Sequence, residues 1–253
     1  MFRPRIIPAL LLRNMGLVKS VAFKNYKYIG DPINAVKIFN DLRADELVFL
    51  DILASREKRV VSLDFVLNVG DEANMPFSVG GGIRTIKDIR DILKAGSEKV
   101  VISTYAAEEP NFIKEASLEF GSSTITVCID VKKNFFGKQQ VLACGGSKPT
   151  DLNPVFFAKI MEEKGAGELI INSIDKDGSM EGYDINLIRA VSDAVTIPVV
   201  AMGGAGKIED LKKAVEDGHA SAVAAGSLFV FHGPRRAVLI NYPQPDELKA
   251  IFK

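Results

Sequence analysis

Two glycine-rich segments have the composition of phosphate-binding turns. Gly80-Gly81-Gly82 follows one short apolar run, and Gly203-Gly204 follows another. Because glycine has no Cβ atom, its backbone can approach an anion closely, and a following helix N-terminus adds partial positive charge. The sequence predicts two cradles, which suit a ligand with a phosphate at each end. The first comprises Gly81, Gly82, Ser103 and Thr104, and the second comprises Asp177, Gly178, Gly203, Gly204, Ala225, Gly226 and Ser227. The alternative is that these glycines only form tight turns.

Metal and disulfide chemistry are not predicted. The chain has two cysteines and two histidines, which are too few for a zinc quartet or a disulfide framework. Cys128 is expected in the core and Cys144 as a partly exposed thiol. We also expect core positions for four phenylalanines: Phe39, Phe49, Phe77 and Phe120.

These candidate residues sit at the ends of short apolar runs that alternate with amphipathic stretches. Eight runs are predicted as strands: 5–12, 46–51, 76–79, 99–102, 124–130, 168–171, 197–201 and 220–225. Helices are predicted between them, including 33–42, 86–94 and 208–217. Nearly continuous apolar strands separated by helices indicate a covered parallel sheet. The predicted fold is therefore α/β, a (β/α)₈ TIM barrel, with an open doubly wound sheet as the alternative.

An internal repeat supports the barrel. Residues 76–88 align with 198–210 at an offset of 122, and the same offset carries 45–47 onto 167–169. One repeated half-barrel explains these matches. We therefore predict a single domain, 1–253, with half-barrels at about 1–122 and 123–231 and a distinctive tail at about 232–253.

The charge balance excludes some partners. The 253 residues include 32 Lys and Arg against 32 Asp and Glu. The chain therefore has no overall positive field that would attract nucleic acid or favour polybasic binding to a membrane. No apolar run reaches ~18 residues, and the start of the chain lacks a signal-peptide pattern. We expect a soluble, cytoplasmic protein with no nucleic-acid or membrane partner.

Several longer motifs carry a family resemblance. They are Gly-Asp-Pro at 30–32, Asp-Glu-Leu-Val-Phe-Leu-Asp-Ile at 45–52, Ala-Ser-Arg-Glu-Lys-Arg at 54–59, Val-Gly-Gly-Gly-Ile at 79–83, Gly-Ala-Gly-Glu at 165–168, Ser-Ile-Asp-Lys-Asp-Gly at 173–178 and Gly-Gly-Ala-Gly-Lys at 203–207. From Arg5 to about Phe231 the chain resembles the cyclase subunit of imidazole glycerol phosphate synthase. The related isomerase family fits 45–59 and 173–184 less well. The resemblance implies a glutaminase subunit docked beneath the barrel, ammonia passing through it, and a bisphosphorylated nucleotide as acceptor; no cofactor is expected.

The resemblance also implies two catalytic carboxylates, at the ends of the first and fifth strands. Asp130 fits the second position, but Leu11 occupies the first, and leucine cannot transfer a proton. Lys19 matches the lysine of a flexible loop; the alternative for it is a solvated loop lysine. Asp51, which ends the second strand, could orient either loops or ligand.

A ring of four charges at the bottom of the barrel is implied as an ammonia gate. Arg5, Glu46, Lys99 and Glu168 match it. The alternative is that they only stabilise the N-terminal face. Leu11 on the same strand face as Arg5 would make the lumen more apolar, which suits neutral ammonia.

Two segments resemble a paralogue found with bacterial surface-polysaccharide genes: Ile-Pro-Ala-Leu-Leu-Leu at 7–12 and the tail at 232–243. This resemblance implies that the barrel conducts ammonia from a glutaminase to an N-acetyl sugar amidotransferase in lipopolysaccharide biosynthesis. The amidotransferase converts an acetamido group into an acetamidino group. Two alternatives stay open. One is an active cyclase (lyase) that makes imidazole glycerol phosphate and the carboxamide ribotide in histidine biosynthesis, and the other is a bisphosphate-binding barrel without catalysis.

Overall fold

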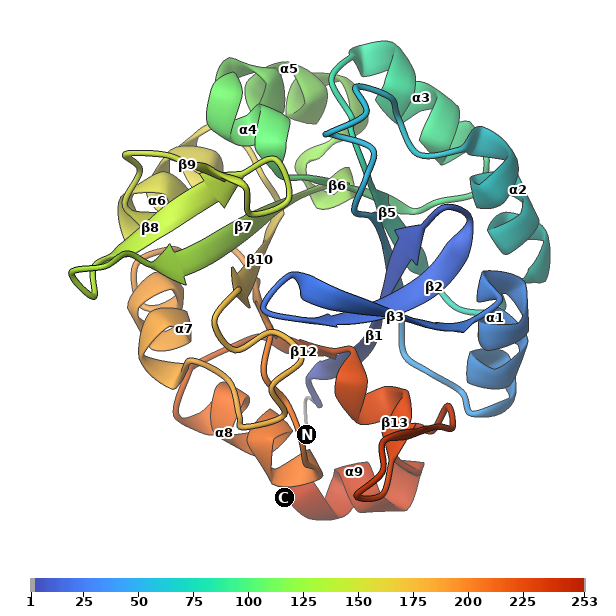
Figure 1. Ribbon diagram of the computed structural model, residues 1–253. Coiled ribbons are helices and arrows are strands. Elements are labelled where there is room, and N and C mark those ends of the chain that lie inside the picture. Colours follow the sequence, from blue (N-terminus) through green and yellow to red (C-terminus); the bar gives the residue numbers. More distant parts are fainter. Residues whose placement is uncertain (1–2, 253) are drawn as a thin grey trace.

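Eight parallel strands form a closed barrel with helices around it (Figure 1). The computed structural model describes residues 3–252. Going round, the strands are β1 (Arg5–Arg13), β4 (Leu47–Asp51), β5 (Phe77–Gly80), β6 (Lys99–Ile102), β7 (Ile125–Lys133), β10 (Glu168–Ser173), β11 (Val199–Met202) and β12 (Ala222–Ala225). Parallel pairing of β10 with β7 and of β12 with β1 closes the ring. The predicted (β/α)₈ barrel is confirmed, and the open-sheet alternative is wrong.

The helices cover the outside of the barrel. They are α1 (Pro32–Asp41), α2 (Leu63–Glu72), α3 (Ile86–Lys94), α4 (Thr104–Glu108), α5 (Asn111–Phe120), α6 (Pro154–Glu163), α7 (Ile185–Ser192), α8 (Ile208–Glu216) and α9 (Pro245–Ile251), with short 3₁₀ turns at Ser122–Thr124 and Ser227–Phe229. Local sequence explains where they begin. Asp31 caps α1 ahead of Pro32, and Thr85 forms a capping box with Asp88 at α3.

The core has two parts. The larger lies between barrel and helices and includes Phe39, Phe49 and Phe77; Phe120 packs against it partly buried. The smaller fills the barrel lumen with mostly aliphatic side chains: Ile7, Ala9, Val48, Val101, Cys128, Ile170, Val200, Met202, Ala222 and Ala224. The core positions expected for the phenylalanines and Cys128 are confirmed, and Cys144 is partly exposed as predicted.

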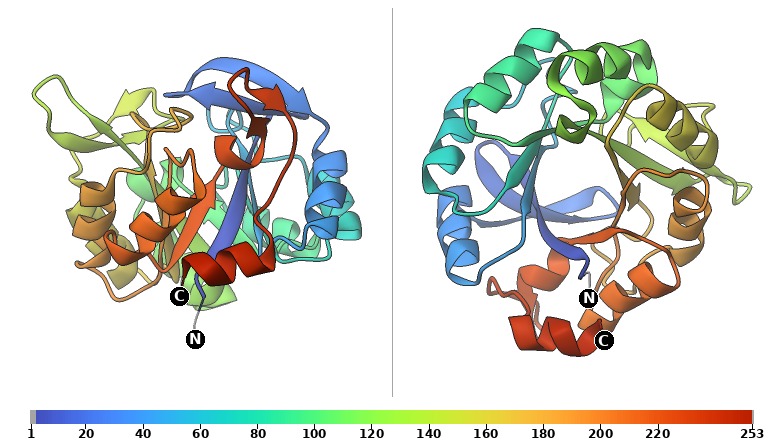
Figure 2. Two further views of the ribbon diagram at one scale, coloured as in Figure 1. Left: turned by 90° about the horizontal axis from the view of Figure 1, so that it is seen from below. Right: turned by 180° about the vertical axis from the view of Figure 1, so that it is seen from behind.

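Three antiparallel hairpins rise from the end of the barrel opposite the chain termini (Figure 2, left). The first joins β1, β2 (Gly16–Val21) and β3 (Lys24–Gly30), the second joins β7, β8 (Gln139–Ala143) and β9 (Lys148–Pro149), and the third pairs β13 (Phe231–His232) with β14 (Ala237–Val238). The alternative for Lys19, a solvated loop lysine, is wrong, because Lys19 lies in strand β2 and is buried. Its match to the lysine implied by the resemblance stays a prediction.

The tail runs back along the outside of the barrel to the opposite end, where α9 lies near the N-terminus (Figure 2). Tyr242 anchors it there. Its hydroxyl donates to the Ile6 carbonyl oxygen at 3.0 Å and accepts from the Asp45 N–H at 3.2 Å. Its ring packs against Phe229, with 5.4 Å between centroids.

Within residues 3–252, none of the helices combines the length and apolar character needed to cross a bilayer.

Replacing Tyr242 by Phe should lower the free energy of unfolding by about 1–3 kcal/mol, because it leaves the buried Ile6 carbonyl and the partly buried Asp45 N–H without this partner. Urea denaturation measures the change. Tyr28→Phe is the matched control, since Tyr28 is 65% exposed and should shift stability by less than about 0.5 kcal/mol. Equal stability of the two variants would contradict the anchoring role of the hydroxyl.

Candidate functional site

The carboxyl ends of the strands surround a cavity of about 130 Å³ at the hairpin end of the barrel. Leu11, Lys19, Asp51 and Asp130 line it. Every residue predicted for the two phosphate cradles lines it as well: Gly81, Gly82, Ser103, Thr104, Asp177, Gly178, Gly203, Gly204, Ala225, Gly226 and Ser227. The residues that the sequence predicts at the carboxyl ends of the strands therefore meet in one pocket, which we call the mouth of the barrel.

Asp130 is the buried acid of this pocket. Its Oδ1 accepts a hydrogen bond from Asn172 Nδ2 at 2.8 Å, and Cys128 Sγ lies 4.0 Å away. Burial raises the pKa of Asp130 from 3.8 to about 7; the Asn172 hydrogen bond opposes this rise, and the nearby Asp177 carboxylate adds to it. A carboxyl group with such a pKa can both give and take a proton near neutral pH.

Lys19 is the buried base of the pocket. Its Nζ donates to the Ala9 carbonyl oxygen at 2.5 Å. Burial lowers the pKa of Lys19 to about 8, although the Asp177 carboxylate acts against this. The ammonium group also lies directly over the second cradle, because a Cβ added at Gly226 would come within 2.5 Å of Nζ. A ligand bound there would meet a positive charge.

Contacts with the loop after β10 hold the first hairpin over the pocket. Ser20 Oγ donates to Asp177 Oδ2 at 2.9 Å, and the Ala22 N–H donates to the Asp177 carbonyl oxygen at 2.9 Å. Burial raises the pKa of Asp177, while the Ser20 hydrogen bond and Lys19 lower it. Sequence analysis missed Ser20 and Asn172. Asn172 carried a signal, since it shares strand parity with Glu168 and Ile170, which puts its side chain in the lumen; Ser20 carried none.

Close packing accounts for part of the glycine pattern. A Cβ at Gly82 would lie 1.8 Å from the Arg59 carbonyl oxygen, and one at Gly178 would lie 1.9 Å from that of Ser20. Both residues also have positive φ, +67° and +68°. The chain needs glycine at these two positions whatever binds, so the phosphate cradles stay a prediction.

Asp51 holds a loop in place. Its Oδ1 accepts from the Leu53 and Ala54 N–H groups at 3.1 and 3.2 Å, and Oδ2 pairs with Arg59 at 2.5 Å. Of its two possible roles, the geometry accounts for the orientation of the loop; contact with a ligand stays a prediction.

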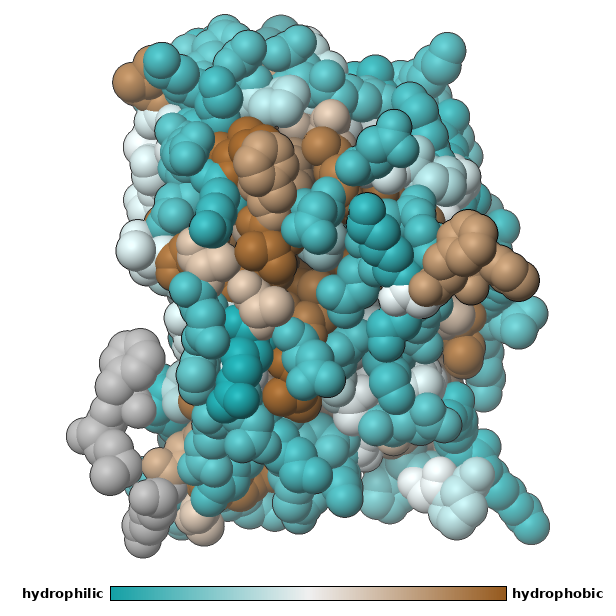
Figure 3. All heavy atoms as spheres, turned by 90° about the vertical axis from the view of Figure 1, so that its left-hand side faces the viewer, coloured by the Kyte–Doolittle hydropathy of each residue, from teal (hydrophilic) through white to brown (hydrophobic). Residues whose placement is uncertain are grey.

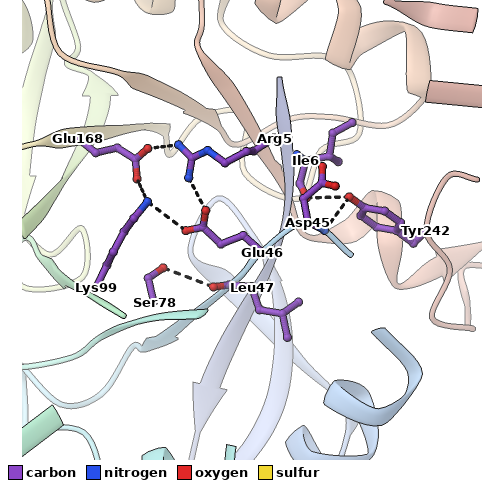
Figure 4. A network of polar contacts seen from close by, with 9 residues as sticks. All are labelled: Arg5, Ile6, Asp45, Glu46, Leu47, Ser78, Lys99, Glu168 and Tyr242. Carbon is purple, nitrogen blue, oxygen red and sulfur yellow. Dashed lines mark hydrogen bonds and ion pairs between the residues drawn. The ribbon is translucent and has the colours of Figure 1, made fainter. Parts of the chain in front are cut away.

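Four charged residues form a ring at the opposite end of the lumen (Figure 4). Arg5 contacts both Glu46 and Glu168, and Lys99 Nζ lies 3.0 Å from Glu168 and 3.6 Å from Glu46. Burial disfavours the charge on Arg5, but the Glu168 and Glu46 carboxylates outweigh it and raise the pKa of Arg5. Two cations and two anions alternate, so the ring closes the barrel by lateral pairing.

The described part of the chain, residues 3–252, holds no cluster of three or more His, Cys, Asp or Glu side chains that could bind a metal ion. Cys128 is buried in the lumen, and burial next to Asp130 raises the pKa of its thiol well above the ordinary value.

Residues 5–234 match the family described as "Histidine biosynthesis protein". The chain belongs to this family. A "Putative imidazole glycerol phosphate synthase subunit HisF" of Leptospira interrogans is 43% identical over 253 residues, 100% of both chains. Proteins with the same description but numbered hisF3 in Vibrio vulnificus and hisF2 in Pseudomonas aeruginosa are each 45% identical, over 250 and 248 residues. These alignments cover 98% of this chain and 96% and 99% of the relatives.

Within this family fold, Leu11 gives the mouth an apolar wall opposite its acid. Leu11 is paired with Leu50 across the β1–β4 ladder, and both side chains line the pocket. The position on β1 where the resemblance implies a carboxylate therefore offers no proton.

Replacing Asp130 by Asn should stabilise the protein increasingly as the pH rises. The folded state holds the Asp130 proton more tightly than the unfolded chain, so wild-type stability falls between pH ~4 and pH ~7 and levels off above. Asn keeps the acceptor for Asn172 and does not ionise, so its advantage should reach about 1–4 kcal/mol at pH 8 and shrink toward pH 4.

Urea unfolding at several pH values measures this difference. Asp71→Asn is the control, because Asp71 is exposed on α2 and should give a small, constant difference. A pH-independent advantage of the Asp130 variant would contradict the raised pKa.

Proposed function

We propose that this chain is the ammonia-conducting barrel of a glutamine amidotransferase assembly. It receives ammonia from a glutaminase subunit at the ion ring and delivers it through the lumen to an N-acetyl sugar amidotransferase that serves cytoplasmic steps of surface-polysaccharide biosynthesis. The observation that carries the proposal is the combination of an assembled ion ring at one end with Leu11 at the other, where cyclisation would need a second acid.

The lumen between the two ends supports conduction of a neutral molecule. Its lining is mostly aliphatic, with the hydroxyls of Ser78 and Thr126 buried above the ring. Ser78 Oγ donates to the Leu47 carbonyl oxygen at 3.4 Å, whereas Thr126 Oγ1 has no partner among the described residues. An apolar lining strongly disfavours ammonium relative to ammonia, because an ion loses its hydration there.

The mouth supports binding more than ring closure. General acid–base catalysis around an imine needs one group to give a proton and another to take it. Asp130 serves one role, and Leu11 cannot serve the other. Lys19 over the second cradle would pair with a phosphorylated ligand, so the mouth is suited to hold such a molecule beside the outlet for ammonia.

A working cyclase is the second candidate, and one observation favours it. Asp130 and Lys19 have pKa values of about 7 and about 8, so the pocket keeps two groups that can exchange protons near neutral pH. The two candidates differ in what happens when ammonia and the formimino nucleotide are supplied directly.

Wild-type protein supplied with ammonia and the bisphosphorylated formimino nucleotide should show almost no ring closure, and Leu11→Asp should raise that rate by about 100-fold or more, because it restores the missing acid. Product formation is followed by chromatography. Leu11→Asn is the matched control, since it brings a similar polar side chain that does not ionise. Turnover by the wild type at the level of Leu11→Asp would favour the cyclase.

Lys99→Ala should lower the yield of acetamidino sugar per glutamine hydrolysed in an assembly with glutaminase and amidotransferase, because a ring that lacks one cation no longer excludes water. The yield with ammonium salt in place of glutamine should stay unchanged. Lys94→Ala, exposed on α3, is the control. An unaltered ratio of product to glutamine in Lys99→Ala would count against a gate.

A further inference from the structure

The hairpin end of the barrel carries an unusual share of the exposed apolar side chains. Of eleven large hydrophobic residues that are exposed in the described structure, seven lie on the three hairpins. They are Met15, Val21 and Tyr28 on the first, Phe135 and Phe136 on the second, and Val238 and Leu239 on the third. The other four are spread over the outer helices. Exposed apolar groups gathered on one face mark an interaction site.

The tip of the second hairpin presents two exposed aromatic rings above a hydrogen-bonded turn. Phe135 and Phe136 are 98% and 89% exposed, and their rings meet edge to face with 5.6 Å between centroids. Asn134 Oδ1 accepts from the N–H groups of Phe136 and Lys138, both at 3.0 Å, which fixes the turn beneath the rings. Figure 3 shows a hydrophobic projection near one edge of the face, apart from the hydrophobic groups at its centre. Preformed aromatic anchors lose little conformational freedom on binding.

The same hairpins hold a strong positive charge. Segments 13–30, 132–149 and 231–242 contain ten of the chain's 32 Lys and Arg residues and none of its 32 Asp and Glu residues, so the rest of the chain carries a net charge of −10. Lys19 is the buried member; the other nine are Arg13, Lys24, Lys27, Lys132, Lys133, Lys138, Lys148, Arg235 and Arg236. The overall neutrality of the chain conceals this separation.

A shallow groove adds a concave element beside the third hairpin. It has a volume of about 580 Å³ and lies between this hairpin and the start of α8, with Met180, Phe231 and Pro234 among its lining residues. Lys27 Nζ lies 5.4 Å from the centre of the Phe231 ring, which ties the first hairpin to the third. The first and third hairpins are therefore in contact, and all three hairpins rise from the same end of the barrel (Figure 2, left).

We propose that these three hairpins form the docking surface for the enzyme that consumes the ammonia, and that this partner presents an acidic surface with apolar pockets. The inference rests on the proposed function, because it assigns the partner's position. Apolar anchors give such a contact its affinity, and complementary charge gives it orientation and a fast encounter.

A protein fits this surface better than the other possible occupants. A partner seated on all three hairpins covers the pocket and continues the lumen into its own active site, so ammonia does not escape. A bilayer in the same place would block the outlet with lipid. A nucleic acid would use the positive charge, but aliphatic tips such as Leu239 and Met15 offer it no specific contact.

The test uses the barrel, its glutaminase subunit and the purified N-acetyl sugar amidotransferase encoded in the same genome. Phe135→Ser/Phe136→Ser removes the apolar anchors, and Lys24→Glu/Lys138→Glu/Arg235→Glu reverses one charge on each hairpin. Calorimetry should show affinity for the amidotransferase reduced at least about tenfold by either variant. Glutamine-driven formation of the acetamidino sugar should fall by a similar factor, while ammonium-driven formation and glutamine binding by the glutaminase stay unchanged.

Matched controls make the same number of apolar-to-serine and charge-reversing substitutions on the outer helices. Leu67→Ser/Leu118→Ser and Lys114→Glu/Lys159→Glu/Lys213→Glu should bind the amidotransferase as wild type does. Thermal denaturation of each variant verifies folding, because all substituted side chains are exposed.

The outcomes separate this inference from the proposed function. If wild-type components give no glutamine-driven product, the proposed function fails and the docking inference fails with it. If they give product and both hairpin variants bind as tightly as the controls, only the docking inference is overturned. Two further results would overturn it: Phe135- and Phe136-dependent sedimentation with phosphatidylglycerol vesicles, and self-association of the barrel that the hairpin variants abolish.

Discussion

Parallel pairing of β12 with β1 closes the sheet, and the positions of all other parts follow from this contact. In a closed parallel barrel every strand ends at the same face, so residues as distant in sequence as Leu11, Asp130 and Ser227 line one pocket. Closure also makes alternate residues point into the lumen between the two ends, which their side chains fill. One end then carries charges that pair laterally, and the other carries the buried groups Asp130 and Lys19 beside an apolar wall.

Buried charged groups are ion-paired at one end of the barrel and form no ion pair with each other at the opposite end. At the ring, each charged group has partners of opposite sign, so desolvation is largely offset, although such a network adds little net stability. At the mouth, Asp130 and Lys19 are buried without an ion pair to each other, and both pKa values move toward neutrality. Leu11 adds an apolar side chain to this region, at the position where the resemblance implies a carboxylate. The ion ring thus lies at one end of the lumen, and Asp130 and Lys19, which can lose their charge near neutral pH, lie at the other.

Much of the barrel could be predicted from sequence, because strand and helix periodicity are local signals and the repeat can be read by aligning the chain with itself. The ends of α3 and β6 agree with the predicted ranges. The cradle residues were predicted from their positions after strands, whereas Leu11, Lys19 and Asp130 were singled out through the family resemblance. The hairpins were not predicted. Lys19 is buried because Ser20 and Ala22 bind the loop at Asp177, a contact between segments more than 150 residues apart that no local pattern encodes. The position of Tyr242 beside Ile6 depends on tail packing in the same way.

The separation of charge along the barrel axis has a consequence for how the molecule behaves in solution. A chain with equal numbers of acidic and basic residues and an isoelectric point near 6.8 nevertheless carries ten basic and no acidic residues on its hairpin segments, so its charge is unevenly distributed, with the excess of basic residues at the hairpin end. In the field of an acidic body it experiences a torque before it experiences net attraction, so it turns its hairpin end toward that body before contact. Salt at ~0.15 M limits this alignment to separations of about 8 Å.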